Sequence, residues 1–203
     1  MDYQSIIKIL NSSEFKELRK KYDFLQFDDL VRLMSIGKVQ QLAKNEHFIK
    51  EGDVSKKVGF ILKGLIRFYH LKDGEEYNLI FKHEYQMVSS FESIVLNLPS
   101  TYSFEALEDT TLLVYDYDKM EELFAKYPKL ERFGRYFIQH ELARAVRIFE
   151  THLFLSPEAR YLKFMEEYAH LMNRVSLKHL ASFLGVTPVS LSRIRKRVAE
   201  FKQ

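Results

Sequence analysis

A succession of short apolar segments separated by turns fills residues 38–116 and constrains the fold more than any other feature. Each segment is rich in Val, Ile, Phe and Tyr, residue types that favour β-strands. The segments read VGFIL, LIRFYHL, YNLIF, YSFEAL and TLLVYD, and turn signals fall at Lys63-Gly64, Lys72-Asp73-Gly74 and Glu108-Asp109. Strands this short and this regularly spaced predict an antiparallel roll or sandwich rather than a doubly wound sheet.

Helices are expected on both sides of this β region, which makes the fold class α+β. Residues 1–36 show apolar side chains at helical spacing, with a separate short helix from Phe27 to Ile36 that ends at Gly37. After the strands, Asp118 is expected to cap a short helix that runs through Tyr127.

A long helix is expected over about residues 128–154, beginning at Pro128, and Ser156-Pro157 then starts another helix to about Met172 and marks a hinge. One apolar stripe of the long helix comprises Ile138, Leu142, Ala145, Phe149 and Leu153; a second begins with Leu130, Phe133 and Phe137, and Val146 and Ile148 widen the surface. A helix that is apolar on more than one side needs more than one partner. The β region is one partner, and the same helix of a second copy is the simplest other one. A monomeric core helix is the alternative.

Residues 177–197, LKHLASFLGVTPVSLSRIRKR, carry the most informative motif. Gly185 ends a first helix, and Thr187 can cap a second one that starts with Pro188. This spacing predicts a helix-turn-helix, with a short helical hairpin of charged outer face as the alternative. The positions expected to be buried are Leu177, Leu180, Ala181, Leu184, Leu191, Ile194 and Val198, with Val186 between the helices. The residues expected to contact DNA are Thr187, Val189, Ser190, Ser192, Arg193, Lys196 and Arg197.

The charge distribution agrees with a nucleic-acid-binding segment at the C-terminal end. Residues 174–203 hold seven basic residues and one acid, a net charge of +6, whereas the whole chain carries +3. The remainder is therefore mildly acidic. A basic segment on an acidic body is typical of a nucleic-acid-binding module attached to another domain, and a solvated basic helix is the other interpretation.

Composition excludes several classes of protein. The chain has no Cys, which removes disulfides, thiolate zinc sites and iron–sulfur clusters. No apolar run is long enough to span a membrane, and the first residues do not resemble a secretory signal, so a cytoplasmic location without a membrane partner is expected. The seven His residues show no pair at helical ligand spacing, so we expect neither a metal nor a haem cofactor. No catalytic motif is present, and an enzyme is not expected.

Taken together, these features resemble the Crp/Fnr family of bacterial transcription regulators over roughly residues 25–200. The most specific segments are residues 48–79, which resemble the start of a cyclic-nucleotide-binding roll, and residues 181–196 of the helix-turn-helix. The resemblance implies a homodimer on a palindromic operator in double-stranded DNA, with RNA polymerase as a candidate partner. It also implies a sensor domain over residues 1–127, a dimerisation helix over 128–155 and a DNA-binding domain over 156–203.

The sequence departs from that family where cyclic AMP would bind. Members that bind it hold the phosphate with a Gly-Glu pair and an Arg, but residues 83–107 contain neither Gly nor Arg. The effector pocket implied by the resemblance consists of Ser89, Ser90, Phe91, Glu92, Thr101 and Tyr102. Because a buried phosphate needs a positive charge or a nest of backbone amides, we expect an unknown small-molecule effector or none, and not cyclic AMP. The aromatic residues there are more simply read as core.

The second helix of the motif departs as well. Family members reading the common half-site usually have a Glu followed four positions later by an Arg; here those positions are Val189 and Arg193. Valine cannot accept from cytosine but can contact a thymine methyl group, so a different operator is expected. Residues 173–176 also leave little room for the β wing that usually accompanies the motif. A ligand-binding or protein-interaction module without specific DNA binding remains the rival function.

Overall fold

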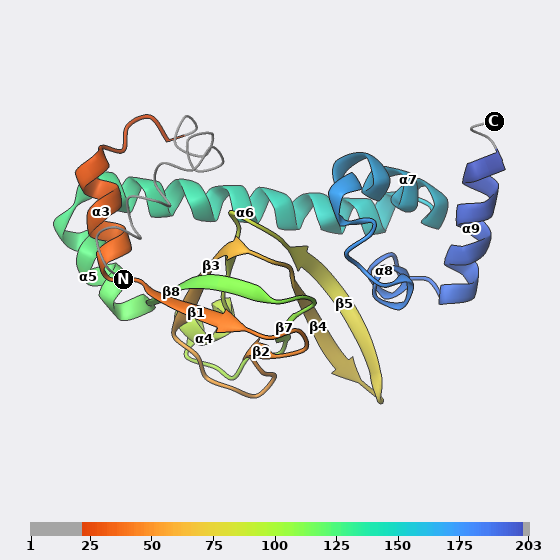
Figure 1. Ribbon diagram of the computed structural model, residues 1–203, viewed down its shortest axis with the longest axis horizontal. Coiled ribbons are helices and arrows are strands. Elements are labelled where there is room, and N and C mark those ends of the chain that lie inside the picture. The colour runs from red at the N-terminus through yellow and green to blue at the C-terminus, as the bar shows by residue number, and fades with distance from the viewer. Residues whose placement is uncertain (1–21, 201–203) are drawn as a thin grey trace.

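This computed structural model describes residues 22–200, and the first part of the helical prediction over residues 1–36 lies outside them. The strands are β1 (Lys38–Leu42), β2 (His47–Ile49), β3 (Lys57–Lys63), β4 (Ile66–Lys72), β5 (Glu75–Lys82), β6 (Met87–Val88), β7 (Ser103–Ala106) and β8 (Thr110–Asp116). The helices are α3 (Phe27–Ser35), α4 (Phe91–Leu96), α5 (Tyr117–Lys126), α6 (Pro128–Phe154), α7 (Pro157–Glu167), the 3₁₀ helix η1 (Ala169–Leu171), α8 (Leu177–Phe183) and α9 (Pro188–Glu200). The labels are those of Figure 1.

Two four-stranded sheets form the roll, in the orders β1-β8-β3-β6 and β2-β7-β4-β5. The paired strands run antiparallel throughout. Their inner faces share one apolar core, in which Ile61, Ile66 and Phe104 are almost completely buried. The predicted antiparallel roll is therefore confirmed. The backbone turns with positive φ at Gly64, at Asp73 and at Gly74, where the sequence carries its turn signals.

The helix after the roll begins two residues earlier than the sequence suggested. Asp116, not Asp118, is the N-cap of α5, because its carboxylate accepts a hydrogen bond from the backbone amide of Lys119. Asp118 lies in the first turn and forms an ion pair with Lys56 at 2.7 Å. Both aspartates satisfy the preference for acids at a helix start, so spacing alone does not choose between them.

Helices α6 and α7 both begin where the sequence predicts, but α7 ends earlier than predicted. Helix α6 spans 128–154 as expected, and Ser156 caps α7 by accepting from the amide of Ala159. The predicted end near Met172 is wrong, because α7 stops at Glu167 and the chain tightens into η1. That change of direction buries Leu171 completely within the C-terminal core.

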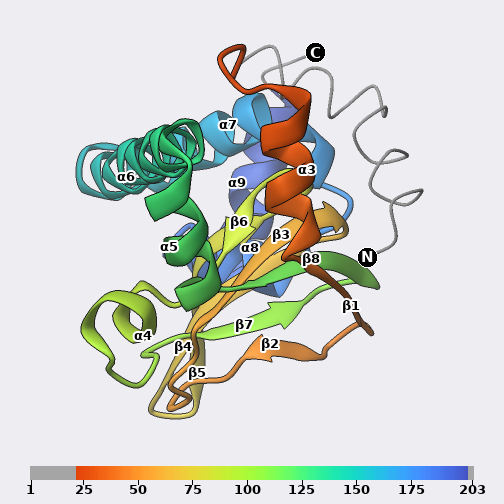
Figure 2. The same cartoon turned by 90° about the vertical axis from the view of Figure 1, so that its left-hand side faces the viewer.

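Helix α6 runs along the whole roll and joins it to the C-terminal helices (Figure 1). At one end α3 and α5 pack on the roll, and at the other α7, α8 and α9 gather (Figures 1 and 2). The C-terminal core includes Leu65, Phe81 and Leu107 of the roll, packed with helical residues such as Phe164. The C-terminal helices are therefore docked on the roll rather than separated from it.

Candidate nucleic-acid interface and its attachment to the roll

Helices α8 and α9 are joined by a tight turn with the features of a helix-turn-helix. Gly185 has φ +67, which favours glycine, and Thr187 caps α9 by accepting from the amide of Ser190 at 3.1 Å. The residues buried between the two helices and their neighbours are Leu180, Ala181, Leu184, Leu191, Ile194 and Val198. Leu177 differs from the prediction, being 37% exposed. It occupies the first position of α8, beyond the contact with α9.

The residues expected to contact DNA lie on the cap and outer face of α9. Thr187, Val189, Ser192, Arg193, Lys196 and Arg197 are exposed, and Ser190 is half-buried with its hydroxyl 2.9 Å from that of Thr187. Val189, at 63% exposure, presents an apolar side chain at the start of this face. The structure thus places six of the seven on α9 and Thr187 at its start.

Several basic residues of the C-terminal segment are already paired. Arg197 contacts Glu158 of α7 at 2.8 Å, and Lys178 lies 3.9 Å from Glu76. Within residues 22–200, no ion pair involves Arg193, Arg195 or Lys196. Part of the positive charge of this segment is therefore neutralised within the protein, and its described cations without an ion pair lie on α9.

Arg174 is the basic residue of the segment that is most strongly neutralised. Its guanidinium lies 2.8 Å from Glu84 and 2.7 Å from Glu108, both in the roll. Burial raises the pKa of Glu84, but hydrogen bonds from Arg174 and from the amide of Gly64 outweigh that effect and bring the pKa to about 2. The ion pairs therefore fasten the segment that precedes α8 to the β-roll.

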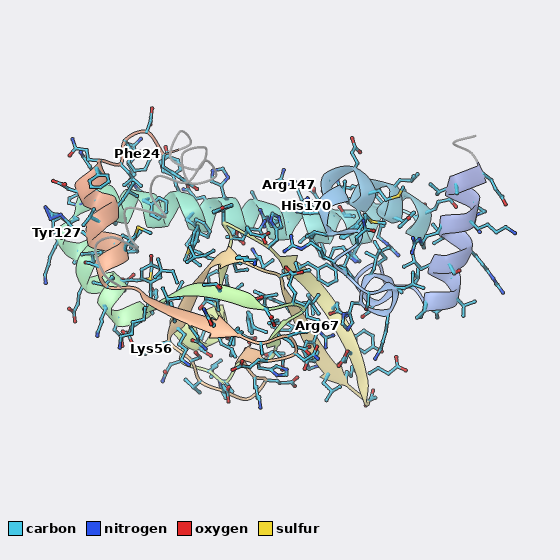
Figure 3. All side chains as sticks on the ribbon, viewed as in Figure 1. Phe24, Lys56, Arg67, Tyr127, Arg147 and His170 are labelled. Carbon is cyan, nitrogen blue, oxygen red and sulfur yellow. The ribbon has the colours of Figure 1, made fainter. Side chains whose placement is uncertain are left out.

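A buried charge cluster on the outer face of the second sheet forms another part of this attachment. Arg67 of β4, labelled in Figure 3, is 3% exposed. Its Nε donates to Glu105 at 2.6 Å and its Nη1 to Glu76 at 2.8 Å. The hydrogen bond from Arg67 lowers the pKa of Glu76. The guanidinium also lies over the ring of Tyr69, 4.0 Å from its centroid. Sequence reasoning missed this cluster, because its members come from three strands and no local pattern links them.

Helix α8 docks on that cluster through the edge of β5. The hydroxyl of Ser182 donates to the carbonyl of Glu76 at 2.7 Å and accepts from the amide of Asn78 at 2.9 Å. Burial, followed by the positive charge of Arg67, lowers the pKa of His179 on the same helix. One helix of the motif is therefore held by the roll, while α9 keeps its outer face open.

Two histidines meet where the roll contacts η1. The rings of His83, directly after β5, and His170 have centroids 4.6 Å apart, and the side-chain amide of Gln86 lies 2.8 Å from Nε2 of His83. A neutral imidazole can accept that hydrogen bond. Burial and then the charge of His170 lower the pKa of His83 to about 4. The other charged groups acting on this imidazole are Glu84, Arg144 and Arg174.

Acidification is therefore expected to destabilise the protein at this contact. Unfolded His83 binds its proton near pH 6.5 but folded His83 near pH 4, so its contribution is complete above pH 6.5 and is lost as the pH falls toward 4. At about 1.4 kcal/mol per pH unit, the free energy of unfolding should drop by about 2 kcal/mol between pH 7 and pH 5 from this group. Urea denaturation at both pH values measures the change.

Two variants isolate the contribution of His83. His83→Gln should flatten the pH dependence, whereas His140→Gln, an exposed substitution on α6, should leave it as in the wild type. An unchanged pH dependence in His83→Gln would contradict the assignment.

The effector residues proposed from the sequence surround α4. Ser90 caps this helix, and the hydroxyl of Ser89 donates to the carbonyl of Lys57. The carboxylate of Glu92 accepts from both the amide of Thr101, at 2.7 Å, and its hydroxyl, at 2.8 Å. The structure thus brings Glu92 and Thr101 together, and both hydrogen-bond donors of Thr101 are already bound to the carboxylate of Glu92.

The two aromatic members of this set point to different surroundings. Tyr102 packs against the roll core, whereas Phe91 is 48% exposed. The set therefore does not form one closed aromatic wall.

Comparison with known proteins agrees with this architecture. Residues 39–127 match the family model of the cyclic nucleotide-binding domain. The fold is similar to FixK2 from Bradyrhizobium japonicum, with a TM-score of 0.72 and 16% identity over 82% of this chain and 86% of that one. It is also similar to the c-di-GMP-responsive global regulator CLP from Xanthomonas campestris, with a TM-score of 0.70 and 16% identity over 87% of this chain and 93% of that one. The chain has the Crp/Fnr fold. A comparison with curated protein sequences gave no match.

The Crp/Fnr fold appears here without strands in its C-terminal part, as far as the structure describes it. Between β8 and Glu200 every element is helical. The expectation of little room for a β wing is thereby confirmed. Among the helices described, none is both long and apolar enough to cross a membrane.

Proposed function

We propose that the protein is a homodimeric, cytoplasmic transcription regulator that binds a palindromic DNA site through α9. The observation that carries the proposal is the outer face of α9, where Arg193 and Lys196 are exposed, beside the buried Leu191 and Ile194, and form no ion pair with the described residues 22–200. Basic and polar side chains fixed on one helix face can reach base edges and phosphates in the major groove. The proposal includes no catalytic activity.

The assembly follows from α6. Leu142, Phe149 and Leu153 are 64%, 65% and 60% exposed, although Leu130 and Phe137 of the same helix are buried. An exposed apolar stripe along a long helix is destabilising in water unless another surface covers it. A second copy of α6 covers it with the same stripe and places two α9 helices in one particle. In this proposal residues 1–127 form the sensor domain, 128–155 the dimerisation helix and 156–203 the DNA-binding domain.

Arg193 is expected to read a base. Its guanidinium can donate two parallel hydrogen bonds to guanine O6 and N7. Arg193→Ala should therefore weaken binding to the specific site by about 1–3 kcal/mol per half-site and binding to random DNA much less. Titrations of a genomic duplex isolated by the wild-type protein and of its scrambled version, at one salt concentration, measure both losses.

Arg195→Ala is the matched control for Arg193→Ala, because Arg195 is also an exposed residue of α9 and has no ion pair in the part of the chain that the structure describes. It should weaken both duplexes by similar amounts. Equal losses for Arg193→Ala would make Arg193 a phosphate contact, and no loss for either variant would mean that α9 does not bind DNA. If wild-type protein distinguishes no duplex from another, the interaction-module alternative is favoured.

Cyclic AMP is expected not to bind the roll with useful affinity. Its phosphate would meet the carboxylate of Glu92, which already accepts both donors of Thr101, and residues 83–107 supply no Arg. Calorimetric titration should show no low-micromolar site. Measured binding in that range would overturn the expectation, and Glu92→Gln tests whether the carboxylate is the cause of exclusion.

A further inference from the structure

A cleft of about 340 Å³ lies at the junction of α6, α7 and α8, away from the roll pocket and from the outer face of α9. Four cationic side chains line it: Arg144 and Arg147 of α6, and Arg160 and Lys163 of α7. Its size is within the range of small-molecule sites. Its lining includes none of the residues expected to contact DNA or to form the effector pocket.

The positive charges of this cleft are poorly compensated. Lys163 pairs with Glu167 at 3.4 Å, and Glu167 is the one acid among the lining residues. Arg144 and Arg147, by contrast, make no ion pair with any residue in the described range 22–200. The lining therefore holds three positive charges in excess, which repel one another unless an anion joins them.

Arg160 is fixed in place and leaves a donor unused. Its Nη1 donates to the carbonyls of His152 and Leu155, each at 3.2 Å, where α6 ends. Its Nε is buried and has no hydrogen-bond partner among the described residues. Because Arg160 lines the cleft and these two hydrogen bonds already order its side chain, its guanidinium can receive an anionic ligand with little further loss of side-chain freedom.

Three aromatic rings, those of Phe164, Tyr168 and Phe183, also line the cleft. Phe164 and Phe183 have ring centroids 5.6 Å apart, and Tyr168 is 5.3 Å from Phe164. Tyr168 and Phe183 are half-buried. Partly exposed rings beside a cluster of guanidinium groups can pack against a planar ring whose substituent is anionic.

We propose that this cleft binds a nucleoside di- or triphosphate, with the phosphates on Arg144, Arg147 and Arg160 and the base against the aromatic wall. The excess of three positive charges matches a polyphosphate better than a monoester, which would leave cations unpaired. The ligand would contact α6, α7 and α8 together, since Phe183 and Leu184 of α8 line the same cleft. An effect of the nucleotide on DNA affinity rests on the proposed function, whereas binding of the nucleotide to the cleft does not.

The test is calorimetric titration of the full chain, without DNA, with ATP, ADP, inorganic pyrophosphate and adenosine. ATP and ADP should bind, pyrophosphate should bind more weakly, and adenosine should not bind. Arg147→Ala, on the exposed side of α6 (Figure 3), should weaken ATP binding by about tenfold or more, because a charge-assisted hydrogen bond is lost. Arg144→Ala should act in the same direction.

Arg135→Ala is the matched control, since Arg135 is an exposed arginine of α6 outside the cleft. It should bind ATP as the wild type does, and thermal melting should show all three variants folded. Absence of ATP binding, or equal ATP affinity in Arg147→Ala and the wild type, would overturn the proposal. It would also be overturned if Arg147→Ala weakened nucleotide-free DNA binding as strongly as Arg195→Ala, since the cleft would then be a DNA-phosphate surface. If the protein bound no DNA, the proposed function would fail, but the nucleotide titration, which contains no DNA, would still test the cleft.

Discussion

Phe149→Asp is expected to convert the protein from a dimer into a monomer. Phe149 lies in the middle of the exposed stripe of α6, so a symmetric contact between two α6 helices would bury it. A carboxylate there would lose its hydration without gaining a partner, and the symmetry of the dimer would place a second one nearby. Unpaired burial of this kind costs several kcal/mol per site, which corresponds to a dissociation constant raised by about 10³ or more.

Sedimentation velocity at micromolar concentration distinguishes the two states. Leu142→Asp should behave in the same way, because Leu142 belongs to the same stripe. Val39→Asp makes a similar change at an exposed residue of β1, a strand that lies apart from α6 in Figures 1 and 2, and should leave the dimer intact. If the wild-type protein sediments as a monomer, the stripe is not a dimer interface.

DNA affinity is expected to fall by roughly 10³–10⁵ when salt rises from 50 to 200 mM, if the dimer neutralises about 6–10 phosphates. Arg195 and Lys196 of the two protomers supply four of these contacts, and Arg197 brings the number to six by leaving Glu158. Each neutralised phosphate releases condensed counterions, which makes the affinity depend steeply on salt. Fluorescence anisotropy of a labelled duplex over a salt series gives the slope.

Arg195→Ala tests whether this side chain contributes to the salt dependence. Removing one phosphate contact per protomer should reduce the magnitude of the slope of log K against log salt by about 2 for the dimer. A nearly flat titration for the wild type would contradict binding through phosphates. An unchanged slope for Arg195→Ala would place its side chain in solvent.

Local signals in the sequence predicted local structure well. Ser156 and Thr187 cap helices where expected, and Gly185 makes the turn between α8 and α9. These positions depend on a few neighbouring residues, so a single sequence contains the necessary information. Strands β1 and β2 were not individually predicted, because they are short and their burial depends on β8 and β7, which lie far along the chain.

The attachment of the C-terminal helices to the roll could not be predicted in the same way. Arg174 reads as part of a basic segment, and nothing near it in sequence shows that Glu84 and Glu108 neutralise it. His83 and His170 are likewise brought together by the fold alone. Contacts over such separations depend on how whole elements dock, which residue spacing does not encode.

Strand β5 lies at an edge of its sheet, and the hydroxyl of Ser182 occupies the place of a neighbouring strand there. It satisfies the backbone amide of Asn78 and the carbonyl of Glu76, two groups that would otherwise be open to any extended chain. Uncovered edges of this kind recruit strands from other molecules and promote aggregation. If α8 leaves the roll, the edge of β5 is therefore uncovered, and the protein is then least protected against self-association.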